Sequence, residues 1–198
     1  PAPPAAVPQS NEATKALAIG AIALFAATTS HFVACAPETL HLETGLLCSR
    51  DTYLSRGWCR LEQWAFMLAN GTESIYYCPA SRGSGGDAGS GGDGQLQSVS
   101  DVSSWIETSI MVFCGEFTNL EDKDLLVDVV LGLYGLAFVS RLSATGRAAR
   151  PADSDGALWE QLQTHKAAIF PTELFGDLVE LLETELTDAI AQAARGSG

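Results

Sequence analysis

The chain has 198 residues, 46% of them hydrophobic, which is enough for one folded domain with a core of its own. Its formal net charge is −13 and its isoelectric point is near 4.4, so it lacks the clustered Lys and Arg of a nucleic-acid-binding surface. Composition therefore excludes nucleic acid as an expected partner.

The N-terminal region divides into a tail and an apolar segment. Residues 1–15 are rich in Pro and Ala and are expected to form a tail. From Ala16 to Pro37 there is no formal charge, but polar residues interrupt the apolar run after Ala27, and no basic region precedes it. We therefore predict a buried helix, with membrane contact unexpected. The cysteines, interpreted below as reduced, predict a cytoplasmic or organelle-stromal protein. The alternative is a membrane-associated structural subunit anchored through residues 16–36.

A strand, a loop and a helix are expected next. The apolar run His31–Ala36 ends at Pro37 and predicts a core strand. From Arg56 to Ala69 the spacing predicts a helix in which Glu62 lies within an apolar stripe, whereas Gln63 points away from it. A carboxylate among apolar neighbours is costly unless it is paired. Glu62 is therefore interpreted either as half of a buried ion pair with an Arg or as a functional carboxylate.

Trp58-Cys59-x-x-Glu62 resembles the W-C-x-x-E motif that begins a helix in Toll/interleukin-1 receptor (TIR) domains. The string from Arg56 to Glu62 (R-G-W-C-R-L-E) also resembles uncharacterised proteins of algae and other protists, as do residues 112–118 and 169–177. The TIR resemblance covers residues 16–80 and lacks the first strand, the first helix and the nucleotide-binding loop of the family. The missing elements either lie upstream in a longer protein or have been dispensed with.

The resemblance implies a role for Glu62. In TIR proteins that cleave NAD, the Glu of this motif is the catalytic residue, so Glu62 is the candidate catalytic residue and NAD the candidate substrate. Three arginines, Arg50, Arg56 and Arg60, are concentrated beside it and are suited to grip a phosphate or a carboxylate. Together with Trp58 they are the candidate substrate-binding residues. The alternative is that these arginines form structural ion pairs.

The cysteines and histidines do not indicate a metal site. There are five cysteines, an odd number, and no C-x-x-C spacing occurs. Cys35, Cys78 and Cys114 lie in apolar runs and are interpreted as reduced core residues. A cluster of His41, Glu43 and Cys48 is a minor alternative. We therefore expect no metal and no bound cofactor.

The second half of the chain alternates apolar segments with linkers. A short run, Ser74–Cys78, predicts a second strand, and Ser109–Cys114 predicts a third, with a flexible Gly- and Ser-rich insertion at residues 81–95 between them. Apolar residues at helical spacing from Leu125 to Ala137 predict a core-facing helix. Residues 140–156 are expected to be a linker, and residues 157–195 to form C-terminal helices packed on the domain.

The order of these elements predicts an α/β fold, TIR-like or flavodoxin-like, with a mostly parallel central sheet flanked by helices and incomplete at its N-terminus. The domain itself would extend over residues 16–139. Two functions from different classes remain. One is a signalling or interaction module with a protein partner or self-association, and the other is a hydrolase that cleaves NAD through Glu62.

Overall fold

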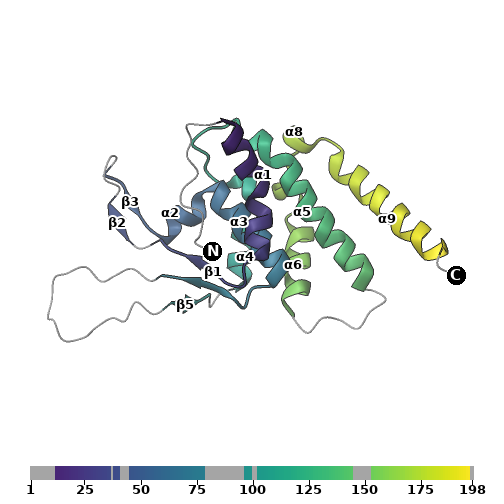
Figure 1. The fold of residues 1–198 in the computed structure, drawn as a ribbon, viewed down its shortest axis with the longest axis horizontal. Coiled ribbons are helices and arrows are strands. Elements are labelled where there is room, and N and C mark those ends of the chain that lie inside the picture. Colours follow the sequence, from purple (N-terminus) through teal and green to yellow (C-terminus); the bar gives the residue numbers. More distant parts are fainter. Residues whose placement is uncertain are drawn as a thin grey trace.

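The computed structural model describes residues 12–36, 38–40, 45–78, 96–99, 102–144 and 153–196 (Figure 1). Of these described residues, 70% are helical and 10% lie in strands, which form one sheet of three strands and another of two. The expected α/β fold, a TIR-like central sheet flanked by helices, is therefore wrong. The sheets are too small to form a layer, and the core is built between helices.

The elements of the described residues follow one another in this order along the chain. They are α1 (Glu12–Thr28), β1 (Phe32–Ala34), β2 (Thr39–Leu40), β3 (Leu47–Cys48), α2 (Arg50–Ser55), α3 (Gly57–Asn70), β4 (Ile75–Tyr77), β5 (Gln97–Ser98), α4 (Val102–Ile110), the 3-10 helix η1 (Val112–Cys114), α5 (Asp122–Ala144), α6 (Asp153–Thr164), α7 (Lys166–Ile169), α8 (Thr172–Phe175) and α9 (Leu178–Gly196).

Helix α3 is the central element, with α1, α2, α4, α5 and η1 packed around it (Figure 1). Leu61, Trp64, Phe66 and Met67 are fully buried, so the helix is covered on most of its circumference rather than along one stripe. The expectation that Gln63 points away from the core is wrong. Its amide is buried, with Nε2 donating to the carbonyl oxygen of Cys59 at 2.7 Å.

The small sheet contains both strands predicted around the motif helix. β1 and β4 pair in parallel, with Phe32 opposite Ile75 and Ala34 opposite Tyr77, and β5 pairs antiparallel with β4. A parallel pair needs a crossover, which α2 and α3 supply. The two predicted strands are therefore confirmed, although each is three residues long. The other sheet is the β2–β3 hairpin.

The third predicted strand, Ser109–Cys114, is wrong. Its first residues end α4, and Val112–Cys114 form η1. Trp105, Ile106, Ser109 and Ile110 are all buried, and their spacing of three and four is helical. A short apolar run has no periodicity of its own, and here the preceding residues decide its conformation.

The C-terminal helices pack around a cluster of aromatic rings. Tyr134 on α5 stacks on Trp159 of α6 with ring centroids 6.1 Å apart, and it meets Phe170 edge-on at 4.9 Å. Phe170 in turn contacts Phe175 of α8 at 5.1 Å. Helix α9 runs alongside α5 at the edge of the molecule (Figure 1). The helix predicted between Leu125 and Ala137 is therefore confirmed as part of α5.

Several expectations fall wholly or partly outside the described residues. These are residues 1–11 of the tail, the loop with His41 and Glu43, the insertion at 81–95, and residues 145–152 of the linker. The tail was expected to extend to residue 15, but α1 already begins at Glu12. Within the described ranges, no group of three metal-ligating side chains occurs. Cys35 and Cys114 are exposed and Cys78 is half-buried, so their assignment to the core is wrong.

One described helix is long and apolar enough to cross a membrane. It is the Asp122–Leu142 part of α5, of which 33% is buried in the fold. The helix predicted in the apolar N-terminal segment is α1, which packs on the core through Ile22, Ala23 and Ala26. It is not the buried helix that was predicted, because Leu17, Leu24 and Phe25 are exposed.

Candidate functional site

Glu62 lies on α3 at a cavity between α1 and β1. The cavity has a volume of about 360 Å³ and is lined by apolar residues of α1 and β1, together with His31 and Tyr53. The Glu62 carboxylate makes no hydrogen bond and no ion pair with any residue that the structure describes. The buried ion pair considered from the sequence is therefore not formed. An unpaired carboxylate in such a place is costly, and it is available to a ligand.

Burial dominates the electrostatics of this region. It raises the pKa of the Glu62 carboxyl above its usual value, and the positive charge of Arg56 opposes the rise. Burial, followed by the charge of Glu62, also raises the pKa of the Cys59 thiol to about 11. The pKa of Tyr53 is raised by burial and then by the charges of Cys59 and Glu62. The charge of Glu62 therefore contributes to the raised pKa values of both Tyr53 and Cys59.

A second cleft lies on the other side of Tyr53. It has a volume of about 630 Å³, within the range of small-molecule sites, and its walls come from the β2–β3 hairpin, α2 and the segment after η1. Arg56 and Glu116 are its charged residues, and Cys35 and Cys48 are among its polar ones. Tyr53 borders both cavities, so Glu62 and Arg56 are placed at neighbouring hollows.

The other predicted binding residues lie elsewhere. The guanidinium of Arg50 lies over the rings of Tyr77 and Trp105, at 5.1 and 5.3 Å from their centroids. Arg60 donates from Nε to the carbonyl oxygen of Leu54 at 2.7 Å and from Nη1 to that of Met111 at 2.8 Å. Burial lowers the pKa of Arg60. Neither arginine lines the cavity of Glu62 or the larger cleft.

Trp58 likewise lines neither cavity and makes packing contacts inside the fold. Its indole Nε1 donates to Asp122 Oδ2 at 3.1 Å, and its ring meets Phe117 edge-on. Beside it, the N–H of Gly57 donates to the carbonyl oxygen of Glu116 at 3.0 Å, and the N–H of Glu116 donates to that of Ser55 at 2.7 Å. The start of α3 is thus fastened to the segment between η1 and α5. Of the predicted set, only Arg56 and Glu62 are brought together.

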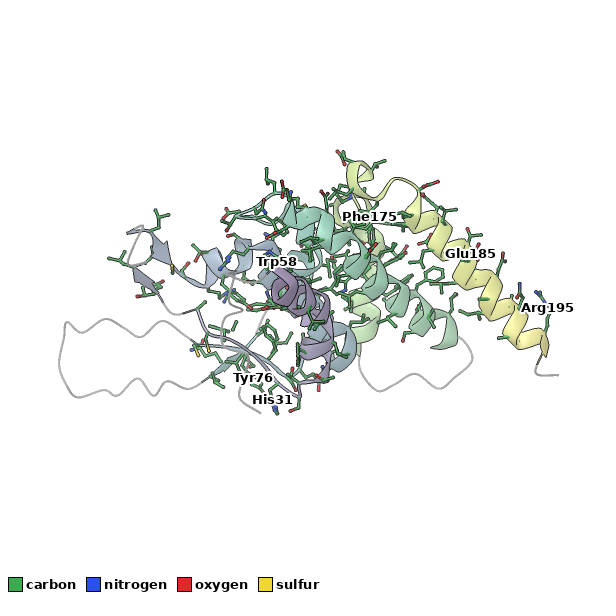
Figure 2. All side chains as sticks on the ribbon, turned by 45° about the horizontal axis from the view of Figure 1, so that its top comes forward. His31, Trp58, Tyr76, Phe175, Glu185 and Arg195 are labelled. Atoms are coloured by element: carbon green, nitrogen blue, oxygen red, sulfur yellow. The ribbon has the colours of Figure 1, made fainter. Side chains whose placement is uncertain are left out.

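The three strings that resemble protist proteins meet in space. Residues 56–62 contact residues 112–118 through the bond from the N–H of Gly57 to the carbonyl oxygen of Glu116. Residues 112–118 contact residues 169–177 through Phe113 and Phe175, whose ring centroids are 5.3 Å apart. Phe175 lies on α8, where Figure 2 labels it. The strings therefore form one packing unit that joins the motif helix to the C-terminal helices.

The structure also places a polar network that the sequence did not indicate. The Tyr134 hydroxyl donates to Glu183 Oε1, and Lys166 Nζ pairs with the same oxygen at 2.7 Å. Gln163 Nε2 donates to the Tyr134 oxygen at 3.4 Å. Burial, followed by the bond to Glu183, raises the pKa of Tyr134. The four residues come from α5, α6, α7 and α9, so no local pattern could reveal them.

Exposed apolar residues occur on both α1 and α5, two helices that contact each other. On α1, Leu17 is 76% exposed, and Leu24 and Phe25 are also exposed. On α5, Leu125 and Leu136 are exposed and lie on one helical face with Gly132, where an added Cβ would meet nothing within 4 Å. This face differs from the core-facing one. We call these residues the α1/α5 surface.

Comparison with protein-family models, with curated proteins and with solved structures finds no match for this chain.

Proposed function

We propose that this domain is a protein-interaction module that binds a basic amphipathic helix across the α1/α5 surface. The observation that carries the proposal is the second apolar face of α5, together with exposed leucines on α1, a helix that contacts α5. Single exposed leucines are common on soluble proteins. Large apolar side chains gathered on two helices in contact are instead typical of an interaction site.

The helical spacing of the surface suits a helical partner. Leu125, Gly132 and Leu136 recur at intervals of seven and four along α5, and Leu17 and Leu24 are seven apart on α1. A partner helix would place its own apolar stripe against these side chains, as helices do in apolar grooves. Gly132 offers open space for close approach.

Charge selects the kind of partner. The chain carries a net charge of −13, and Asp124 and Asp128 are exposed on α5 beside the apolar face. A second copy of the chain would bring like charges together, which is unfavourable. A partner with Lys and Arg around an apolar stripe would gain both apolar burial and attraction.

The test uses a labelled synthetic peptide of about 18 residues, in which leucines at helical spacing are surrounded by lysines. Its binding is measured by fluorescence anisotropy, beside a peptide with Glu in place of every Lys. We expect the basic peptide to bind and the acidic one not to bind. The double variant Leu24→Ser, Leu136→Ser should weaken binding by about tenfold or more, which is about 1.4 kcal/mol or more.

The matched control is Leu181→Ser, because Leu181 is a 53% exposed leucine on α9, outside the α1/α5 surface. Binding that falls equally in this control would contradict the proposal and assign the affinity to net charge alone. A dimer that dissociates in the double variant, detected by sedimentation, would replace the basic partner with a second copy of the chain.

A second candidate function depends on Glu62. Its unpaired carboxylate borders a cavity, which favours chemistry on a glycosidic bond such as the nicotinamide–ribose bond of NAD, where a carboxylate stabilises an oxocarbenium-like transition state. Nicotinamide release by the wild type, abolished in a folded Glu62→Gln variant, is the expected result of this activity. Arg50, Trp58 and Arg60 do not line the cavity, so this function ranks second.

A further inference from the structure

Two cysteines face each other at the carboxyl ends of the parallel strands. β1 and β4 pair with Ala34 opposite Tyr77, so the next residues in register are Cys35 and Cys78. The pairing continues to this point, because the N–H of Cys78 donates to the carbonyl oxygen of Ala34 at 3.0 Å. The side chains of register partners lie on the same face of a sheet.

The two sulfur atoms are in contact. Cys35 Sγ lies 3.6 Å from Cys78 Sγ, and one thiol donates a hydrogen bond to the other. A disulfide bond is about 2.05 Å long and joins Cα atoms about 4.4–6.8 Å apart, a span that neighbouring strands meet. Closing the gap needs side-chain rotation and not a movement of the strands.

Solvent and small reagents can reach the pair. Cys35 is exposed and Cys78 is half-buried, and Cys35 lines the 630 Å³ cleft that contains Arg56. By contrast, Cys59 is buried. The hydrogen bond between Cys35 and Cys78, followed by burial, raises the pKa of Cys35. The Cys35 thiol therefore reacts through its minor thiolate form.

We propose that Cys35 and Cys78 are a redox modification site, at which a low-molecular-weight disulfide oxidises the pair to an intramolecular disulfide. One thiolate attacks a sulfur atom of the small disulfide and releases one small thiolate, which takes up a proton. The second thiolate of the pair then attacks the protein sulfur of the mixed disulfide and releases the other small thiol. Two protein thiols are oxidised and one small disulfide is reduced to two thiols. The new bond ties β1 to β4 on the wall of the cleft.

The test exposes the folded, reduced protein to glutathione buffers of increasing disulfide fraction. The samples are quenched with acid, alkylated after denaturation and digested with trypsin without reduction. Free thiols should fall from five to three per chain, a loss of two. Mass spectrometry should find a linked pair of peptides, residues 16–50 joined to residues 61–82, with a mass that corresponds to the loss of two hydrogens.

Cys48 lies in the same tryptic peptide as Cys35, so the variants decide the assignment. The linked peptides should persist in Cys48→Ser and disappear in Cys35→Ser and Cys78→Ser, each confirmed as folded by circular dichroism. In the last two variants the remaining thiol should instead carry one glutathione. A link that survives in Cys35→Ser and is lost in Cys48→Ser would overturn the proposal. So would a wild-type pair that stays reduced while exposed Cys114 becomes glutathionylated.

Discussion

Gly57 and Gly115 meet backbone to backbone, because a Cβ atom built on Gly115 would lie 2.6 Å from the Cα and N atoms of Gly57. The contact joins the first residue of α3 to the segment after η1, where the N–H of Gly57 also bonds to Glu116. Packing therefore explains why the R-G-W-C-R-L-E string has a glycine at position 57, because any side chain there would overlap the ring of Phe117.

We predict that Gly115→Ala lowers the free energy of unfolding by about 1–3 kcal/mol, the usual cost of inserting a methyl group where there is no room. The matched control is Gly132→Ala in α5, where an added Cβ meets nothing within 4 Å. That change should raise stability by about 0.5–1 kcal/mol, because alanine favours a helix over glycine. Urea unfolding of both variants measures the contrast. Equal effects would mean that the glycine contact is loose.

Arg60 gives the second prediction. Its guanidinium donates to the carbonyl oxygens of Leu54 and Met111, so it joins α2 to the end of α4 from a position on α3. Arg60→Met keeps the aliphatic stem but leaves both acceptors without their charged donor, and we expect a loss of about 2–4 kcal/mol. Arg60→Lys should recover part of it, since an ammonium cannot reproduce the guanidinium fork.

The control for Arg60 is Arg141→Met, an exposed arginine in the last turn of α5. Its removal should change stability by less than about 0.5 kcal/mol. If both substitutions lower the free energy of unfolding equally, the loss at position 60 would be a general effect of net charge and not of the two hydrogen bonds to carbonyl oxygens.

Tyr134 gives the third prediction. Its hydroxyl donates to Glu183, which also pairs with Lys166, so Tyr134→Phe removes one of two partners from that carboxylate. We expect stability to fall by about 1 kcal/mol. A double-mutant cycle with Glu183→Gln should show that the two effects are coupled. Strict additivity would mean that the bond contributes nothing to the packing of α9 on α5.

Local sequence was sufficient to predict elements that have a clear hydrophobic periodicity or clear boundaries. The apolar residues of α5 recur every three or four positions, and β1 and β4 stand out as short apolar runs on either side of a helix. Local sequence was insufficient to predict side-chain burial where the burial depends on contacts with residues distant in the sequence. Gln63 is buried because Ser109, 46 residues away, donates to its side chain.

The candidate site was predictable only in part. The motif placed Glu62 on a helix beside Arg56, and the structure keeps them as electrostatic neighbours. Arg50 and Arg60 do not line the cavity beside Glu62. Arg50 packs on aromatic rings and Arg60 donates to a backbone carbonyl oxygen, and these partners come from segments distant in the sequence. Sequence proximity could not reveal those partners. The facing thiols of Cys35 and Cys78 also depended on strand register, which the sequence did not settle.

The last prediction concerns the pH dependence of Glu62→Gln. Burial raises the pKa of Glu62 in the folded protein above its value in the unfolded chain, so the folded state binds the proton more tightly. As the pH rises through the unfolded and then the folded pKa, wild-type stability therefore falls by the cost of ionising a buried carboxyl. The uncharged amide of the variant has no such cost. The variant should be equal to or more stable than the wild type at neutral pH, and the difference should vanish as the pH falls below the unfolded pKa, near 4.3. Thermal melts of both proteins between about pH 4 and pH 8 measure this difference. A variant that is less stable at neutral pH would show that the ionised carboxylate has a stabilising partner, and it would remove the basis for assigning Glu62 to a site.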